Sequence, residues 1–213
     1  MNYKIQVQSK RMMKKTITLS IISLFLGTII SGCLGDGFKS NSNEISISSP
    51  NWTKSDFWEY SVKTSNLEVS TTMVVTIDND ATDYYIGAGS LEDAKRHAVL
   101  NHNPALGRVQ MSDYSVYENN QPQKIIDFPL ETSKSWSFSL YGEDEFIASV
   151  IGIENGLAEI SAVSNTGARI SYIFSQEARW FSYFEFNNAN GETVLSMELA
   201  NYGTGFTGNA YFC

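Results

Sequence analysis

Residues 145–202 read EFIASVIGIENGLAEISAVSNTGARISYIFSQEARWFSYFEFNNANGETVLSMELANY. Polar and apolar residues alternate along most of this stretch, with the period of two that is typical of β-strands. The Asn155-Gly156 dipeptide is a strong signal for a tight hairpin between two strands. The stretch therefore predicts a meander of antiparallel strands at residues 145–153, 157–164, 169–175, 180–186 and 192–202.

The same alternation precedes the meander at residues 57–62, 69–77 and 136–140. Each of these runs fits a strand with one face on the core and one in water. One helix is expected from Ser90 to Asn101, because Ser90 can cap its start and Glu92 and Asp93 favour its positive end. The expected fold is mainly β, a curved antiparallel sheet or half-open β-barrel built as a meander with one short α-helix.

The first residues of the chain have the three-part layout of an export signal. The apolar run from Thr16 to Ile30 ends at Ile30-Ser31-Gly32-Cys33, which resembles the lipobox of prokaryotic lipoproteins, and the continuation through Gly35 is similar to archaeal ones. The run is shorter than the roughly 20 residues that a spanning helix needs. An uncleaved membrane anchor and a simple secreted form are the alternatives. The basic residues that precede the run are Lys4, Lys10, Arg11, Lys14 and Lys15.

The lipobox resemblance implies that the signal helix, residues 1–32, is removed and that the Cys33 thiol carries lipid. Membrane lipid is then the first partner, and two acyl chains hold a protein firmly where one does not. We expect the protein on the outer face of the cytoplasmic membrane or the cell surface. Residues 33–50 are expected to form a flexible tether and residues 51–213 a single domain. Cys213 would have no partner within the chain and is either free or available for an intermolecular bridge.

The charge balance of the chain argues against anionic partners, nucleic acid above all. The sequence has 15 Lys and Arg and 23 Asp and Glu, and five of the basic residues precede Cys33, so the mature charge is 10 − 23 = −13. Such a body is repelled by nucleic acid and by anionic lipid headgroups. The excess of acid favours either simple solubility outside the cell or the attraction of cationic ligands.

Three short motifs in the body resemble a known group. Residues 55–60 read SDFWEY, similar to a G-D-Y-W-E-Y strand, and residues 127–136 read DFPLETSKSW, similar to F-P-L-x-x-G-K-x-W. Residues 198–202 read ELANY, which resembles the end of the same group's last hairpin. These motifs occur in the TapB-like group of cell-surface lipoproteins and the related DUF3108-type proteins. The resemblance implies a half-open antiparallel sheet without established catalytic residues, although Ser133 replaces the group's glycine and its V-P-A-G-T-F segment is not evident.

Catalytic and metal motifs are weak. His97 and His102 are five residues apart, a spacing that does not place both on one helical face, and neither an H-E-x-x-H nor a G-x-S-x-G motif is present. No cofactor is expected. Three acidic residues form a weak calcium candidate, because hard cations prefer several oxygens close together; an ordinary acidic turn is the alternative. They are Asp78, Asp80 and Asp83. Asn51-Trp52-Thr53 is a candidate glycosylation site.

The aromatic residues suggest a binding surface. The run 180–186 is apolar on both faces, which is expected either for a strand covered on both sides or for one that lines an apolar cleft. Aromatic residues from several strands could converge there, namely Trp58, Trp136, Tyr172, Trp180 and Phe184. The expected function is non-catalytic: to bind an apolar or amphipathic ligand, or to dock an envelope protein. A structural component of the envelope and an exported hydrolase are the alternatives.

Overall fold

The computed structural model describes residues 45–65, 70–87, 107–207 and 210–212. These residues are mainly β, as predicted, and contain no helix. None of their elements is therefore a helix of the length and apolar character that a membrane span requires. The predicted signal helix at 1–32, the helix at 90–101 and four candidate residues lie outside the described residues. The four are Cys33, His97, His102 and Cys213.

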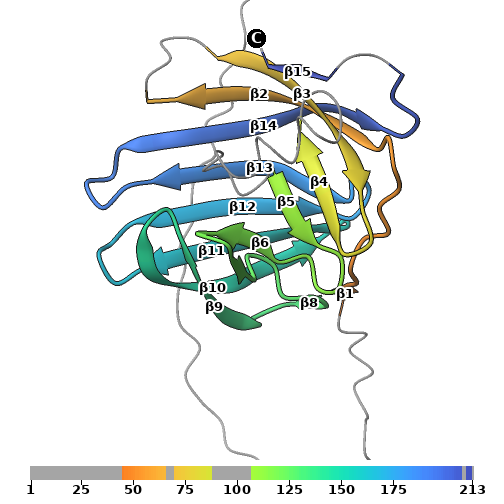
Figure 1. Cartoon of the computed structure of the whole chain (residues 1–213). Coiled ribbons are helices and arrows are strands. Elements are labelled where there is room, and N and C mark those ends of the chain that lie inside the picture. Colours follow the sequence, from red (N-terminus) through yellow and green to blue (C-terminus); the bar gives the residue numbers. More distant parts are fainter. Residues whose placement is uncertain (1–44, 66–69, 88–106, 208–209, 213) are drawn as a thin grey trace, which may run out of the picture. The chain divides into compact units, whose positions relative to one another are not determined.

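One antiparallel sheet contains almost all the strands, in the order β7-β6-β5-β4-β3-β2-β14-β13-β12-β11-β10-β9, with β15 paired to β3 (Figure 1). The pairing of β2 with β14 joins the two halves of the chain, because all other neighbours on this path are consecutive in sequence. The strands of the first half are β2 (Phe57–Thr64), β3 (Thr71–Asn79), β4 (Asp83–Gly87), β5 (Gly107–Gln110), β6 (Val116–Glu118) and β7 (Gln121–Gln123). Those of the second half are β9 (Ser135–Leu140), β10 (Glu143–Glu154), β11 (Leu157–Ser164), β12 (Arg169–Ser175), β13 (Trp180–Asn187), β14 (Thr193–Gly203) and β15 (Tyr211–Phe212).

The sheet curls until its two ends almost meet. The amide of Ser139 on β9 donates to Oε1 of Gln123 on β7 at 2.7 Å. The amide of Gly142, after β9, donates to Oε1 of Glu118 on β6 at 3.2 Å. Side chains therefore close the seam, and the fold is a nearly closed barrel rather than an open sheet. This result confirms the predicted fold class.

The fold begins earlier than predicted. β1 (Ser46–Ile47) pairs with β8 (Leu130–Glu131) in a separate two-stranded sheet. Ile47 and Leu130 are both buried in the core. Residues 46–50 therefore belong to the domain, and their assignment to the flexible tether was wrong. Their polar composition concealed a two-residue strand that is held by its pairing with β8 and by one buried side chain, Ile47.

Turn chemistry fixes the register of the meander. Asn155 and Gly156 both have positive φ, 51° and 76°, as the predicted two-residue hairpin requires. A bulge between Val150 and Gly152 then shifts the pairing of β10 with β11. All five meander strands begin and end within two residues of their predicted bounds, because strong turn residues separate them. The bulge, by contrast, leaves no signal in the alternation.

The core is a continuous aromatic cluster inside the curled sheet. Trp52 packs edge-on against Trp58, Tyr84, Tyr114 and Trp180, at ring-centroid distances of 4.6–5.7 Å. Its indole nitrogen donates to the carbonyl of Arg179 at 2.8 Å. The segment before β2 is thus joined to the β12–β13 turn. Geometry of this kind contributes roughly 0.5–1.5 kcal/mol per aromatic pair beyond area burial.

Candidate docking surface

The predicted aromatic surface lies in the interior. Trp58, Tyr172, Trp180 and Phe184 do converge, but each is at most 1% exposed. The Trp58 indole donates to the carbonyl of Ala178 and the Tyr172 hydroxyl to that of Ile125. These four side chains stabilise the core and cannot reach a partner, so their assignment to a ligand or partner surface was wrong. The sheet curls far enough for its inward faces to cover one another.

Trp136 is the fifth residue of the predicted surface and lies at the end of the strand path, on β9. Its ring is half-buried on the inward side with Phe138 and Leu140. Its indole Nε1 is buried and donates no hydrogen bond. Trp136 therefore packs at the margin of the core.

The three carboxylates of the calcium candidate have other partners. Asp78 pairs with Lys54 at 2.9 Å, and Asp80 accepts hydrogen bonds from the amides of Thr82 and Asp83. No group of acidic or thiol side chains in the described part of the chain is arranged to hold a metal ion. These contacts favour the ordinary acidic turn, and the described residues lend no support to the weak calcium candidate.

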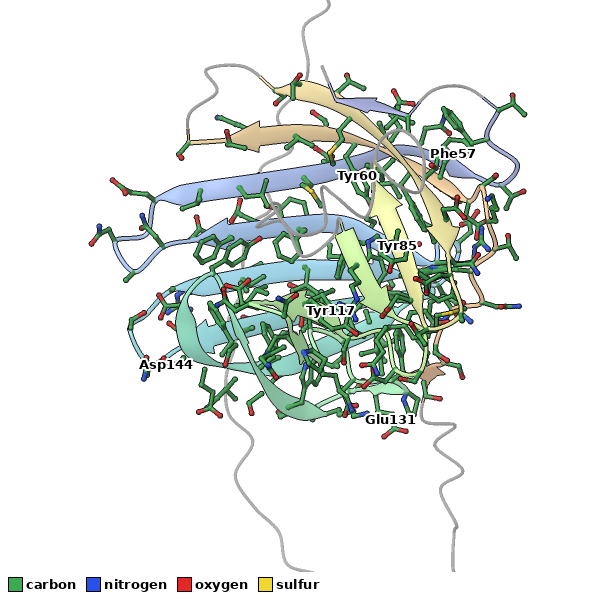
Figure 2. All side chains as sticks on the ribbon, in the orientation of Figure 1. Phe57, Tyr60, Tyr85, Tyr117, Glu131 and Asp144 are labelled. Atoms are coloured by element: carbon green, nitrogen blue, oxygen red, sulfur yellow. The ribbon has the colours of Figure 1, made fainter. Side chains whose placement is uncertain are left out.

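Asp83 forms the most connected polar cluster of the first half. It is buried and pairs with Arg108 at 3.1 Å, while Tyr117 donates to its other oxygen. The Arg108 guanidinium lies 3.8 Å from the centroid of the Tyr117 ring. Figure 2 labels Tyr117 and the neighbouring Tyr85. Burial and a hydrogen bond to Asp80 raise the pKa of the neighbouring Tyr85 to about 12. The ion pair and the Tyr117 hydrogen bond tie β4, β5 and β6 together, although the buried Nε of Arg108 makes no hydrogen bond of its own.

Exposed apolar side chains lie on the outward face of β10 and β11, the face that points away from the core. Ile147 and Ile151 on β10 are 60% and 57% exposed, and Leu157 on β11 is 43% exposed. Their strand neighbours Phe146, Ala148 and Val150 point inward and are buried. β10 is therefore apolar on both faces, whereas a strand with one wet face needs only one. We call Ile147, Ile151 and Leu157 the apolar patch.

A row of serines crosses the patch. The register places Ser135, Ser149, Ser161 and Ser171 opposite one another across β9, β10, β11 and β12. The Ser135 and Ser149 hydroxyls lie 2.7 Å apart. Serine side chains are short, so a partner can approach the sheet closely between Ile147 and Ile151.

The charged residues on the strands of the patch and on β9 are all acidic. Residues 135–164, which form β9, β10 and β11, contain no Lys or Arg. Arg169 on β12 is the cation across the ladder, opposite Val163. Glu145 is on the same face of β10 as Ile147, two residues before it, and Glu159 is opposite Gly152 beside Ile151. The acidic residues of the three strands are Glu143, Asp144, Glu145, Glu154 and Glu159, of which Figure 2 marks Asp144 next to the β9–β10 turn.

A shallow pocket of about 540 Å³ adjoins the patch at Leu157. The β10–β11 and β12–β13 turns line it with Asn155, Gly156, Leu157, Ser175, Gln176 and Glu177. Leu157 supplies an apolar wall, and Glu177 supplies a negative charge. A long side chain with an apolar stem and a cationic head is the shape that such a pocket accommodates.

Sequence reasoning missed this surface although a signal was present. Residues 146–151 read FIASVI, a run that is apolar at both alternating positions except for Ser149. The equivalent feature in 180–186 drew attention to a strand that proved to be buried. A strand that is buried on both faces and a strand that exposes one apolar face have the same sequence pattern. Only the position of the strand in the sheet distinguishes the two.

Comparison with known protein families, with characterised proteins and with solved structures finds no match to the chain. The resemblance to TapB-like and DUF3108-type proteins therefore stays a prediction. Asn51 is exposed, as a glycosylation site requires, and its carbonyl accepts a hydrogen bond from Arg179 at 3.0 Å.

Proposed function

We propose that the chain is an exported lipoprotein that is anchored through Cys33 and acts as a non-catalytic docking domain for an envelope protein. The observation that carries the proposal is the apolar patch. Three of the five large hydrophobic side chains that are exposed in the described residues lie on the adjacent strands β10 and β11, and exposed apolar surface of this kind marks interaction sites in soluble proteins. Docking is favoured over an apolar ligand, since four of the five residues expected to bind such a ligand are part of the core.

Lipid anchoring is consistent with a docking role. A lipidated domain is confined near the membrane, which raises its effective concentration toward a partner in the same envelope. The residues from Cys33 to the first strand at Ser46 are polar and would place the domain off the lipid surface. The net charge of the mature chain keeps its body away from anionic headgroups.

The first experiment is the intact mass of the protein recovered from native membranes. A mass of residues 33–213 plus lipid supports the lipoprotein. A full-length unmodified chain overturns it in favour of an uncleaved anchor. The second experiment replaces Ile147 with a photo-cross-linking phenylalanine derivative and irradiates intact cells.

A matched position serves as the control for cross-linking. Ser61 on β2 is also exposed and outward-facing, but it is separated from the patch by β12, β13 and β14. A discrete protein adduct from position 147 and none from position 61 supports docking at the patch. Equal adducts from both positions, or none from 147, overturn it.

A further inference from the structure

We propose that the partner which docks on the apolar patch is a cationic amphipathic polypeptide segment, one that carries apolar side chains beside lysine or arginine. This inference rests on the proposed docking function and adds the chemistry of the partner. It follows from the coincidence of two features on the same face, exposed aliphatic side chains and acidic residues on strands that contain no Lys or Arg.

The apolar part of the surface supplies the contact area. The apolar patch consists of solvent-facing side chains on two adjacent strands. The short side chains of the serine row allow a partner to come close to the backbone between Ile147 and Ile151. Burial of such side chains removes apolar surface from water and so favours association. A purely cationic, polar partner would leave this contribution unused.

The acidic residues beside the patch favour a partner that carries positive charge. Glu145 lies two residues before Ile147 on β10, and Glu159 lies beside Ile151 and two residues after Leu157 on β11. The strands β9 to β11 contain no Lys or Arg. A neutral apolar partner would bring its surface against these carboxylates and cost them hydration without compensation. A segment with lysine or arginine beside its apolar residues pairs with them instead, and the complementarity of charge also fixes its orientation.

The pocket beside Leu157 provides an anchor for one long cationic side chain. The aliphatic stem can lie along Leu157, and the charged head can reach the Glu177 carboxylate. Glu177 already accepts from the exposed hydroxyl of Tyr202, whose pKa is raised by that hydrogen bond. The Glu177 carboxylate lines the pocket and is therefore in place to pair with that charged head.

Two other occupants fit the surface less well. A second copy of the chain packed about a twofold axis would place the same acidic residues opposite one another, and like charges in an interface oppose association. An anionic lipid surface would repel these residues for the same reason. A cationic polypeptide is the occupant that matches both the apolar and the charged part of the face.

The test uses the lipidated chain in discs of neutral lipid, with empty discs as the reference. Three synthetic peptides of equal length are compared by fluorescence anisotropy: Leu/Lys, Leu/Glu and Ser/Lys. We expect the Leu/Lys peptide to bind, the Ser/Lys peptide to bind more weakly and the Leu/Glu peptide to fail. Added salt should weaken the Leu/Lys complex, because it screens exposed charges within roughly 10 Å at 0.1 M.

Variants locate the binding site. Glu145→Gln with Glu159→Gln should weaken Leu/Lys binding by about three- to tenfold, as expected for two exposed ion pairs. Ile147→Ser with Ile151→Ser should weaken it at least as much. Glu59→Gln with Glu198→Gln removes the same charge from β2 and β14 and should leave binding unchanged. Equal loss in this control pair means general charge attraction and overturns the proposal.

The outcomes distinguish a failure of the proposed partner class from a failure of the proposed docking function. A cross-link at position 147 in cells together with failure of the Leu/Lys peptide retains docking and overturns the cationic partner. Tight binding of the Leu/Glu peptide does the same. Binding to anionic vesicles, or a dimer that the two Ile→Ser changes dissociate, overturns the proposed partner in favour of lipid or a second copy.

Discussion

The amide of Ser139 donates a hydrogen bond to Oε1 of Gln123 at 2.7 Å, and this contact joins the two ends of the twelve-strand path. No backbone ladder pairs β7 with β9 among the described strands, so side chains provide the closure. The seam is therefore the place at which the barrel is expected to open first. A short strand of three residues, β7, forms one of its edges.

Gln123→Ala should loosen the seam. The substitution leaves the Ser139 amide without its acceptor, and the loss of such a bond costs about 0.5–1.5 kcal/mol. We expect a lower urea midpoint and faster hydrogen exchange at the Ser139 amide. Gln121→Ala on the same strand is the control, because Gln121 is exposed. Equal exchange at Ser139 in both variants would show that the contact does not hold the seam.

Gly156→Ala should destabilise the β10–β11 hairpin. Gly156 has φ of 76°, which a residue with a Cβ adopts at a cost of about 1–2 kcal/mol. Gly152→Ala is a matched control, since Gly152 is on the same hairpin, lacks positive φ and has open space where a Cβ would lie. The free energy of unfolding should fall for the first variant and stay level or rise for the second. A similar loss in both would mean that bulge geometry, and not φ, limits the hairpin.

The fold was largely predictable because its information is local. Alternation and turn residues such as Asn155-Gly156 specify each strand of the second half within its own residues. The short strands β4 to β7 were not predicted. They are three to five residues long, too short to show a period, and their pairing depends on partners such as the Asp83–Arg108 ion pair that are distant in sequence.

The candidate site was not predictable in the same way. Trp180 and Ile147 both belong to strands that are apolar on two faces, yet Trp180 is fully buried and Ile147 is 60% exposed. The position of each strand in the curled sheet, and the segments that pack on that strand, determine whether its second apolar face is buried or exposed. That position is set by long-range pairing, above all that of β2 with β14.

Arg179→Met should destabilise the junction between the N-terminal segment and the β12–β13 turn. Asp56 is completely buried and pairs with Arg179 at 2.8 Å, with further hydrogen bonds from Thr53. Loss of one partner of a buried pair costs up to about 3–5 kcal/mol. The effect should be smaller here, because Arg179 is 26% exposed and water can approach it.

Arg169→Met is the control for this change. Arg169 is an exposed residue at the start of β12, so its loss removes the same charge with little effect on the folded state. Urea unfolding followed by tryptophan fluorescence measures both, since Trp52 donates to the Arg179 carbonyl. A loss in Arg169→Met that equals the loss in Arg179→Met would contradict the buried-pair explanation.

The protein should unfold at alkaline pH. Burial raises the pKa of Tyr60 and of Tyr172 well above the ordinary value, and both phenols donate to backbone carbonyls in the core. In the unfolded chain they ionise near pH 10. A folded-state pKa above the unfolded value gives stability that is fully present below about pH 10 and is lost as the pH rises further. The free energy of unfolding should therefore be constant near neutral pH and should fall above about pH 10.

Parallel titrations by tyrosinate absorbance and by the circular dichroism of the strands would test this expectation. Exposed Tyr202 should ionise while the strands are intact, whereas Tyr60 and Tyr172 should ionise only as they are lost. Tyr60→Phe should move the unfolding transition to higher pH because it removes one coupled proton, although the lost hydrogen bond costs about 1 kcal/mol at neutral pH. Tyr202→Phe should reduce the absorbance change that precedes unfolding and leave the unfolding transition in place. Ionisation of all the tyrosines in one step with the sheet intact would mean that water reaches the phenols of the core.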